Sequence, residues 1–200
     1  SPTAIEGSLD AIQRVCDEVG VRLVASYGVT ERHGRDGARR GLDENRRFIG
    51  AGGRGMVGVH AAFTCSDELL HEAAGLANDL GVGVHIHVAD GVDDVDAGRR
   101  LEPLARDNWL IVHCVHLDRD LPGLLAHNPR SNMNNGVGYA RPTQRSNPVV
   151  LGTDGIGADM LEEARLAYVA LRSHDVTESP ETVWRWLDNG YSDRKSTRLN

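Results

Sequence analysis

The stretch VGVHIHVAD, residues 82–90, alternates apolar and imidazole side chains and ends in a carboxylate. Successive side chains of a β-strand point to opposite faces, so His85 and His87 share one face and the apolar residues between them share the other. The apolar face can pack against covering helices, which leaves the histidine face to line the inside of a parallel barrel. We therefore predict a strand that directs both imidazoles into a barrel interior.

Short apolar runs alternate with helical patterns along the chain, which indicates βα units that build a parallel sheet. The runs lie at residues 21–27, 56–61, 82–89, 109–113, 123–127 and 149–152. Helical patterns lie at residues 9–19, 67–80 and 160–171. The pattern at 67–80 has Ser66 as a cap, one apolar face and Gly81 as its stop. The stretch between His113 and His127 is too short for a full crossover helix, so we expect an abbreviated unit there.

Composition limits the classes of protein to consider. The 200 residues are 40% apolar, which suffices for one globular domain with a sizeable core. A formal net charge of -7 and only 4% aromatic residues argue against a broad surface for nucleic acid or anionic membranes. No apolar run approaches the length of a membrane span. We therefore expect a small-molecule substrate as the partner, neither nucleic acid nor a membrane, and we leave open a homo-oligomer.

Cysteine usage indicates the compartment. The chain has three cysteines, Cys16, Cys65 and Cys114. Their odd number and the absence of CxxC spacing favour reduced thiols over a disulfide framework. We therefore expect a cytoplasmic protein.

The last eight residues, DRKSTRLN at 193–200, differ from the rest of the chain. Lys195 is the single lysine among 22 basic residues, whereas arginine is used everywhere else. The peptide also matches the translation of a common sequencing adapter, so we expect foreign sequence that is not part of the fold. The domain is then expected to comprise residues 1–192.

Ligand-type side chains follow the ends of five successive expected strands. They are His60, His87, His113, the stretch 128–132 and Asp154. In parallel α/β folds the carboxyl ends of the strands carry the chemistry. A single inward histidine is more often a hydrogen-bonded core residue, but imidazole and carboxylate groups from several strands together suit zinc or iron. The set therefore favours a metal site.

Other motifs have simpler explanations. GAGGRG, residues 50–55, satisfies G-x-G-x-x-G, but it precedes an expected strand, so we interpret it as a glycine-rich loop and not a dinucleotide site. In HCVHL, residues 113–117, we expect His113 to project into the mouth of the barrel and His116 to have a surface role. Three further histidines are expected to be solvated: His33, His71 and His174.

Four motifs in order carry a resemblance to a known family. HIHVAD (85–90), HCVHL (113–117), HNPRSNMNNGVGY (127–139) and LGTDGIGADM (151–160) resemble the last four barrel strands of the amidohydrolase superfamily. The similarity is greatest to the branch of metal-dependent aminohydrolases and chlorohydrolases, above all the SsnA-type aminohydrolases. The resemblance implies a (β/α)8 barrel with one divalent metal at its carboxyl edge, with zinc as the first choice and iron as the alternative.

The position of the HxH motif indicates how much of the barrel this chain contains. The family's first two metal ligands form an HxH pair on the first strand, but the one HxH of this chain stands where the fifth-strand motif belongs. We therefore expect an α/β chain that forms an incomplete (β/α)8 TIM-type barrel lacking its first strands, which would lie upstream of Ser1. The chain by itself is then expected to be inactive and to bind metal poorly.

The resemblance also implies roles for the site residues. His87 resembles the metal histidine of the fifth strand, and Asp154 resembles the eighth-strand aspartate that binds the metal and moves protons. His113 resembles the sixth-strand histidine that contacts the metal-bound water. Asp90 takes the place of a catalytic acid that is usually glutamate, and its side chain is shorter by about 1.5 Å.

Two residues are expected to contact the substrate. His60 resembles a fourth-strand substrate contact, and Asn132 is a candidate for orienting the substrate or its loop. The implied reaction is deamination of a purine, pyrimidine or triazine-like heterocycle by a metal-bound hydroxide. Deaminases with H-x-E and P-C-x-x-C motifs are excluded because neither motif occurs.

Two alternatives stay open. The first is a hydrolase of the same family with chloride or a cyclic amide as the leaving group. The second is a non-catalytic relative that keeps the barrel for binding, and only the aspartate at position 90 supports it.

Overall fold

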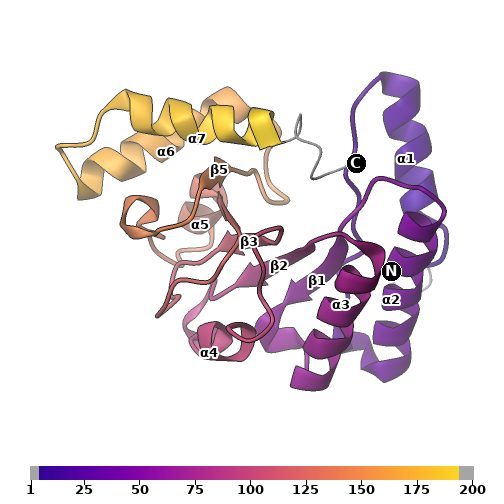
Figure 1. Cartoon of the computed structure of the whole chain (residues 1–200). Helices are drawn as coiled ribbons and strands as arrows, with labels where there is room; N and C mark the ends of the chain where they lie inside the picture. Colours follow the sequence, from indigo (N-terminus) through magenta and orange to yellow (C-terminus); the bar gives the residue numbers. More distant parts are fainter. Residues whose placement is uncertain (1–4, 194–200) are drawn as a thin grey trace.

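A computed structural model describes residues 5–193, which form an α/β fold around a parallel sheet of five strands (Figure 1). The strands are β1 Val57–Ala61, β2 Val84–Val88, β3 Leu110–His113, β4 Leu124–His127 and β5 Val149–Leu151. Their order in the sheet follows their order in the chain, and every neighbouring pair is parallel. A sequential order is that of a barrel sheet, whereas the order of a doubly wound sheet reverses at a switch point.

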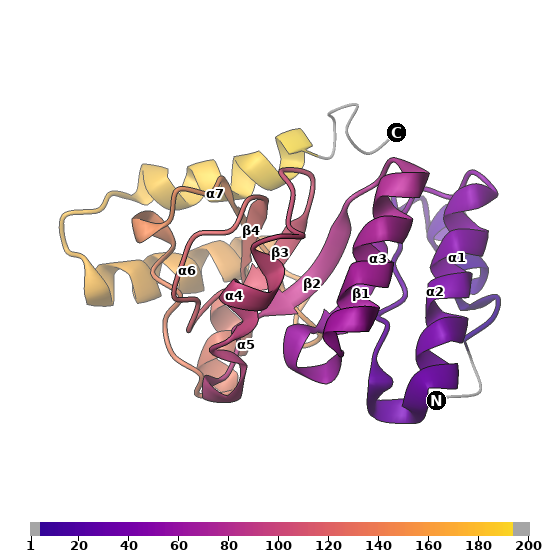
Figure 2. The ribbon, with the colours of Figure 1, turned by 60° about the horizontal axis from the view of Figure 1, so that its bottom comes forward.

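Helices flank this sheet at both of its ends and along its length. They are α1 Ser8–Val19, α2 Gly34–Gly50, α3 Asp67–Leu80, α4 Ala97–Leu101, α5 Pro129–Asn134, α6 Met160–His174 and α7 Pro180–Asp193. Figures 1 and 2 show α1, α2 and α3 at the β1 end and α6 and α7 at the β5 end. Short 3-10 turns occupy Glu31–His33, Ala62–Thr64, Val92–Asp94 and Pro142–Gln144. None of the helices between residues 5 and 193 combines the length and apolar character that crossing a bilayer requires.

Local signals in the sequence account for the helices that we predicted. The patterns at 9–19, 67–80 and 160–171 are confirmed as α1, α3 and α6, although α6 continues to His174. At the start of α3 the Ser66 hydroxyl accepts a hydrogen bond from the amide of Leu69 at 3.3 Å. The helix ends at Gly81, whose φ of 67° is left-handed.

The helix α2 has a buried face of mixed character. Ala38, Leu42 and Phe48 form an apolar stripe on it, and Glu44 and Asn45 are buried on the same face. Gly41 is needed there because a Cβ atom would lie 2.9 Å from the ring of Tyr27. Buried polar side chains and a glycine therefore interrupt the apolar stripe of this helix.

The segment 21–27, which we expect to be a strand, contributes only one isolated parallel bridge, between Ala25 and Gly55, along the edge of the sheet. The backbone amide and carbonyl of Tyr27 are bonded instead to the side chain of Asn45 on α2, both at 2.9 Å. Backbone groups that are bonded to a side chain are not available for a strand ladder. The prediction of a regular strand is therefore wrong, and an amide from a distant helix is the reason.

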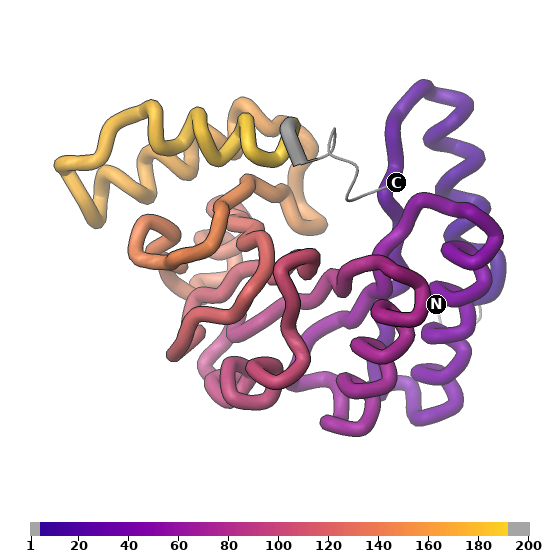
Figure 3. The backbone as a smooth tube through the Cα atoms, in the orientation of Figure 1, coloured from indigo at the N-terminus to yellow at the C-terminus, as the bar shows by residue number. Residues whose placement is uncertain are grey.

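Two loop predictions are confirmed. The chain between β3 and β4, residues 114–123, contains no helix, and its irregular path can be followed in Figure 3. The GAGGRG stretch lies between the last residue of α2 and β1. The expected foreign segment 193–200 lies outside the described residues except for Asp193, the final residue of α7.

The two faces of the sheet have different environments. On β2 the apolar residues are buried and the histidines are half-buried, as predicted. The histidine face borders a hollow of about 1710 Å³, which is also lined by Val112, Ala126 and Val150. The opposite face packs under the helices as part of the main core. The predicted alternation on β2 is therefore confirmed.

His127 at the end of β4 is buried on the side of the helices, and its ring contacts those of Tyr139 and Trp186 at 5.7 and 5.9 Å between centroids. Neither ring nitrogen has a hydrogen-bond partner within the described residues. Burial, with a smaller contribution from the charge of His113, lowers the pKa of His127 to about 3. The histidine is therefore neutral in the folded protein near neutral pH.

Because His127 is buried in its neutral form, we expect the folded protein to lose stability in acid. The unfolded histidine has a pKa of about 6.5, so between pH values of about 3 and 6.5 the unfolded state binds more protons than the folded state. The free energy of unfolding should therefore fall as the pH drops below about 6.5, by up to about 1.4 kcal/mol per pH unit from this group. We expect the His127→Phe variant to lack the part of this decline in the free energy of unfolding that His127 causes. The measurement is urea unfolding of both proteins at neutral and acidic pH. The exposed His71, changed to glutamine, is the control, and an unaltered decline in His127→Phe would refute the assignment.

Candidate active site

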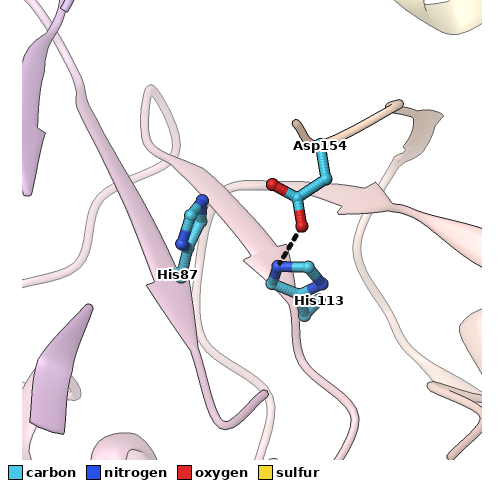
Figure 4. Close-up of side chains that lie close together, drawn as sticks. All are labelled: His87, His113 and Asp154. Atoms are coloured by element: carbon cyan, nitrogen blue, oxygen red, sulfur yellow. Dashed lines mark ion pairs between the residues drawn. The ribbon is translucent and has the colours of Figure 1, made fainter. Parts of the chain in front are cut away.

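Three side chains that the sequence places far apart converge at the carboxyl edge of the sheet. His87 of β2, His113 of β3 and Asp154 beyond β5 each offer a ligand atom, and these atoms lie within 4.8 Å of one another. Figure 4 shows the two imidazoles and the carboxylate directed toward a common space. The predicted convergence of the three residues is confirmed.

Unusual backbone conformations surround this convergence. Ala89, His113 and Asp154 have φ values of 47°, 69° and 52°, in the left-handed region that residues other than glycine seldom adopt. Each such residue costs about 1–3 kcal/mol and is found most often at functional sites. On β3 the preceding Val112 lines the hollow, so strict alternation would turn His113 toward the helices. The left-handed turn at His113 directs its imidazole into the site instead.

His87 lies at the centre of a group of imidazoles. Its ring centroid is 5.1 Å from that of His113, 5.7 Å from that of His60 and 6.0 Å from that of His85. Burial lowers the pKa of His87 to about 4, and the neighbouring His113 and His85 add to this effect. The ring is therefore neutral at pH 7, which is the form that binds metals.

His113 is almost fully buried and has a neighbour at each ring nitrogen. Its Nε2 lies 3.6 Å from Oδ2 of Asp154. Its Nδ1 lies 2.9 Å from Oδ1 of Asn132 and 3.6 Å from Oδ1 of Asp90. The structure thus places three other predicted site residues, Asp154, Asn132 and Asp90, around the ring of His113.

Asp154 is held by a residue that sequence reasoning missed. The buried Ser131 hydroxyl donates a hydrogen bond to Oδ2 of Asp154 at 2.6 Å. Burial would raise the pKa of Asp154, but this hydrogen bond, together with His113 and His87, outweighs burial and lowers it. Ser131 stands in the quoted motif directly before Asn132, but nothing in the sequence indicates its partner.

The remaining histidines fall into two groups. His60 on β1 lies beside His87, and its Nδ1 is 3.2 Å from the hydroxyl of Thr64. His116 is half-buried, and its Nε2 lies 2.9 Å from the carbonyl oxygen of Val137, so its ring joins two loops. The prediction of solvated rings is confirmed for the other three: His33, His71 and His174.

The donor atoms fit a divalent metal. Two imidazoles and a carboxylate are ligand types that zinc prefers. In a tetrahedral site with bonds of about 2.0–2.2 Å, ligand atoms are about 3.3–3.6 Å apart. The separation of 3.6 Å between Nε2 of His113 and Oδ2 of Asp154 agrees with that spacing.

Comparison with known proteins connects this site to a family. The profile of the amidohydrolase family matches residues 2–188. The chain is 33% identical over 190 residues to the 5'-deoxyadenosine deaminase of Methanopyrus kandleri, covering 80% of this chain and 44% of that protein. It is 36% identical over 192 residues to the 5-methylthioadenosine/S-adenosylhomocysteine deaminase of Pelotomaculum thermopropionicum, again covering 80% and 44%. The chain thus spans less than half the length of these relatives.

Solved structures share the fold at lower sequence identity. An adenosine deaminase from Xanthomonas campestris with bound zinc has a TM-score of 0.69 and 19% identity, with 91% of this chain and 51% of that chain covered. Guanine deaminase from C. acetobutylicum with bound guanine has a TM-score of 0.70 and 15% identity, with 92% and 55% covered. With the family profile spanning nearly the whole chain, these findings show that the chain belongs to the amidohydrolase family.

Proposed function

We propose that this chain is part of a metal-dependent aminohydrolase that hydrolytically deaminates a heterocycle. The observation that carries the proposal is the convergence of His87, His113 and Asp154 at the carboxyl edge of the sheet. Among the heterocycles we favour the purine ring of an adenosine-type nucleoside, because the relatives above 30% identity are named as deaminases of such compounds.

The proposed cofactor is one divalent metal, with zinc as the first choice and iron as the alternative. His87 and Asp154 would hold it, with His113 beside them. A divalent ion there would supply Lewis acidity that makes water nucleophilic near neutral pH.

The protein's own residues would handle the protons and the substrate. Asp154, whose pKa is lowered so that it stays ionised, accepts the proton of the attacking water and returns it to the departing amine. Asp90 protonates the neighbouring ring nitrogen, and His113 stabilises the negative charge that develops on oxygen. His60 beside His87 and the unpaired Nδ2 of the buried Asn132 are in place to contact the substrate.

The sheet is proposed to be part of a larger barrel, an incomplete (β/α)8 unit of residues 1–192. The wide hollow on the histidine face would be closed by further strands of the full-length protein. The relatives, which are more than twice as long as the matched region, support this proposal. The three free thiols fit a reducing compartment, so we propose a cytoplasmic location.

Product analysis tests the function. The full-length protein, loaded with zinc, is offered 5'-deoxyadenosine, 5'-methylthioadenosine, guanine and a chlorinated triazine, and ammonia and chloride are measured separately. We expect ammonia release from a purine compound, its loss on chelation of the metal and its return on addition of zinc. Chloride release alone would support the alternative leaving group, and binding without any product would support the non-catalytic alternative.

A further inference from the structure

Three consecutive residues at the start of α5 each contact a different element of the fold, and two of these contacts are with site residues. Arg130 bonds to Glu163 on α6, Ser131 to Asp154 beyond β5, and Asn132 to His113 at the end of β3. We propose that residues 130–132 form a clamp, called here the α5 clamp, that positions Asp154 as a metal ligand and orients the ring of His113 beside it. Ser131 and Asn132 are then positioning residues, a role for Asn132 in addition to its proposed contact with the substrate.

The first residue of the α5 clamp anchors the helix. Nε of Arg130 donates to Oε1 of Glu163 at 2.6 Å, and the backbone amide of Arg130 lies 3.4 Å from Oε2. Glu163 is fully buried, so loss of its partner would leave an uncompensated charge in the core. Gly157 leaves room for the pair, since a Cβ atom there would lie 3.1 Å from Nε of Arg130. The orientation of α5 is thereby tied to α6.

The second residue orients the carboxylate. Ser131 is 1% exposed, and its oxygen accepts a hydrogen bond from Nδ2 of Asn135 at 3.3 Å. With that lone pair engaged, the hydroxyl hydrogen is directed to Oδ2 of Asp154 at 2.6 Å. Asp154 also has a left-handed backbone, so the hydrogen bond restrains a carboxylate on a strained turn.

The third residue selects the tautomer of His113. Nδ1 faces Oδ1 of Asn132 at 2.9 Å, and the next polar atom is a carboxylate oxygen of Asp90 at 3.6 Å. The two carboxylates lie at equal distances from the two ring nitrogens, since Oδ2 of Asp154 is 3.6 Å from Nε2, so the nearer Oδ1 of Asn132 favours a hydrogen on Nδ1. Nε2 then keeps its lone pair on the side of Asp154. In that form Nε2 can accept a hydrogen bond from the attacking water, and a proton taken up there lets the ring stabilise the negative charge that develops on oxygen.

The tautomer is tested by nitrogen NMR of the histidine rings in the full-length, metal-free protein, at a pH well above the ordinary histidine pKa of about 6.5. The signals of His113 are assigned by their loss in His113→Gln. We expect the Nδ1–H form in the parent protein, a shift toward the Nε2–H form in Asn132→Ala and restoration in Asn132→Asp, which keeps an acceptor. The control is Asn134→Ala, on the exposed side of the same helix. An Nε2–H form in the parent protein, or no change in Asn132→Ala, would overturn this part of the inference.

Zinc titration of the same protein tests the hydrogen bond from Ser131. Ser131→Ala is expected to weaken zinc affinity by about 10–100-fold, the usual effect of removing a hydrogen bond that orients a ligand. Asn132→Ala, which acts on His113 and not on a proposed ligand, should change zinc affinity less. Ser131→Thr keeps the hydroxyl and should retain affinity, and the exposed Ser173→Ala is the control. Urea unfolding of each variant verifies that it is folded.

The inference rests on the proposed function only in its choice of metal ligands. If zinc affinity and the tautomer change as expected while the parent protein releases no ammonia, the clamp stands and the proposed deaminase function fails. If the parent protein releases ammonia while Ser131→Ala binds zinc as it does and Asn132→Ala leaves the tautomer unchanged, the clamp is wrong and the function stands.

Discussion

Asp154→Asn is expected to abolish turnover in the full-length protein. Asparagine has nearly the same shape and can still accept the hydrogen bond from Ser131, but it cannot take up a proton from water. Loss of proton transfer alone costs about 10²–10⁴-fold in rate, and loss of the anionic metal ligand adds to this. The measurement is kcat for ammonia release, taken together with the zinc content of the purified variant.

The matched control is Asp79→Asn, the same chemical change at an exposed position on α3. It should leave both kcat and zinc content unaltered. An Asp154→Asn protein that keeps its zinc and turns over at the parent rate would show that Asp154 moves no proton.

Asp90→Ala is expected to slow turnover by about 10²–10⁴-fold, and more than Asp90→Glu does, because alanine removes the acid that protonates the ring. Glutamate restores the longer acid that the family usually carries at this position. The carboxylate of Asp90 already lies 3.6 Å from Nδ1 of His113, which places it at the site. The turn before it is held by the buried Asp94, whose Oδ2 accepts a hydrogen bond from the amide of Ala89 at 2.8 Å.

The rates of the two Asp90 variants are compared with that of Asp93→Ala, an exposed acid in the same loop that should have no effect. Zinc content is measured for all three, so that loss of metal is not mistaken for loss of proton transfer. Equal rates for Asp90→Ala and the parent protein would show that residue 90 has no catalytic role. They would also remove the reason for regarding its substitution as significant.

Strands β1 to β5 and helix α3 could be predicted because their signals are local. These signals are the alternation of side chains with a period of two, the cap at Ser66 and the stop at Gly81. Each of them depends on neighbouring residues alone. The chemistry-bearing residues followed from the same pattern, since side chains at the carboxyl ends of parallel strands share one edge of the sheet. The sequence therefore indicated the convergence of His87, His113 and Asp154.

The errors arose where contacts between distant residues override local preference. The segment 21–27 is not a regular strand because Asn45 bonds the backbone of Tyr27. Helix α2 was not predicted because buried Glu44 and Asn45 and the tightly packed Gly41 interrupt its apolar stripe. In both places polar groups find their partners across the fold, which no window of sequence contains.

By itself the sequence determined which residue types stand at the ends of the strands, because strand alternation and helix caps are properties of short segments. Only the tertiary structure decided how those side chains are held. The left-handed turn that directs His113 inward depends on packing that offsets its cost, and the hydrogen bonds from Ser131 to Asp154 and from His113 to Asn132 join residues 23 and 19 positions apart. Donor and acceptor geometry over such separations is set by the packing of β3, α5 and the loop after β5, so it could be read only from the folded chain.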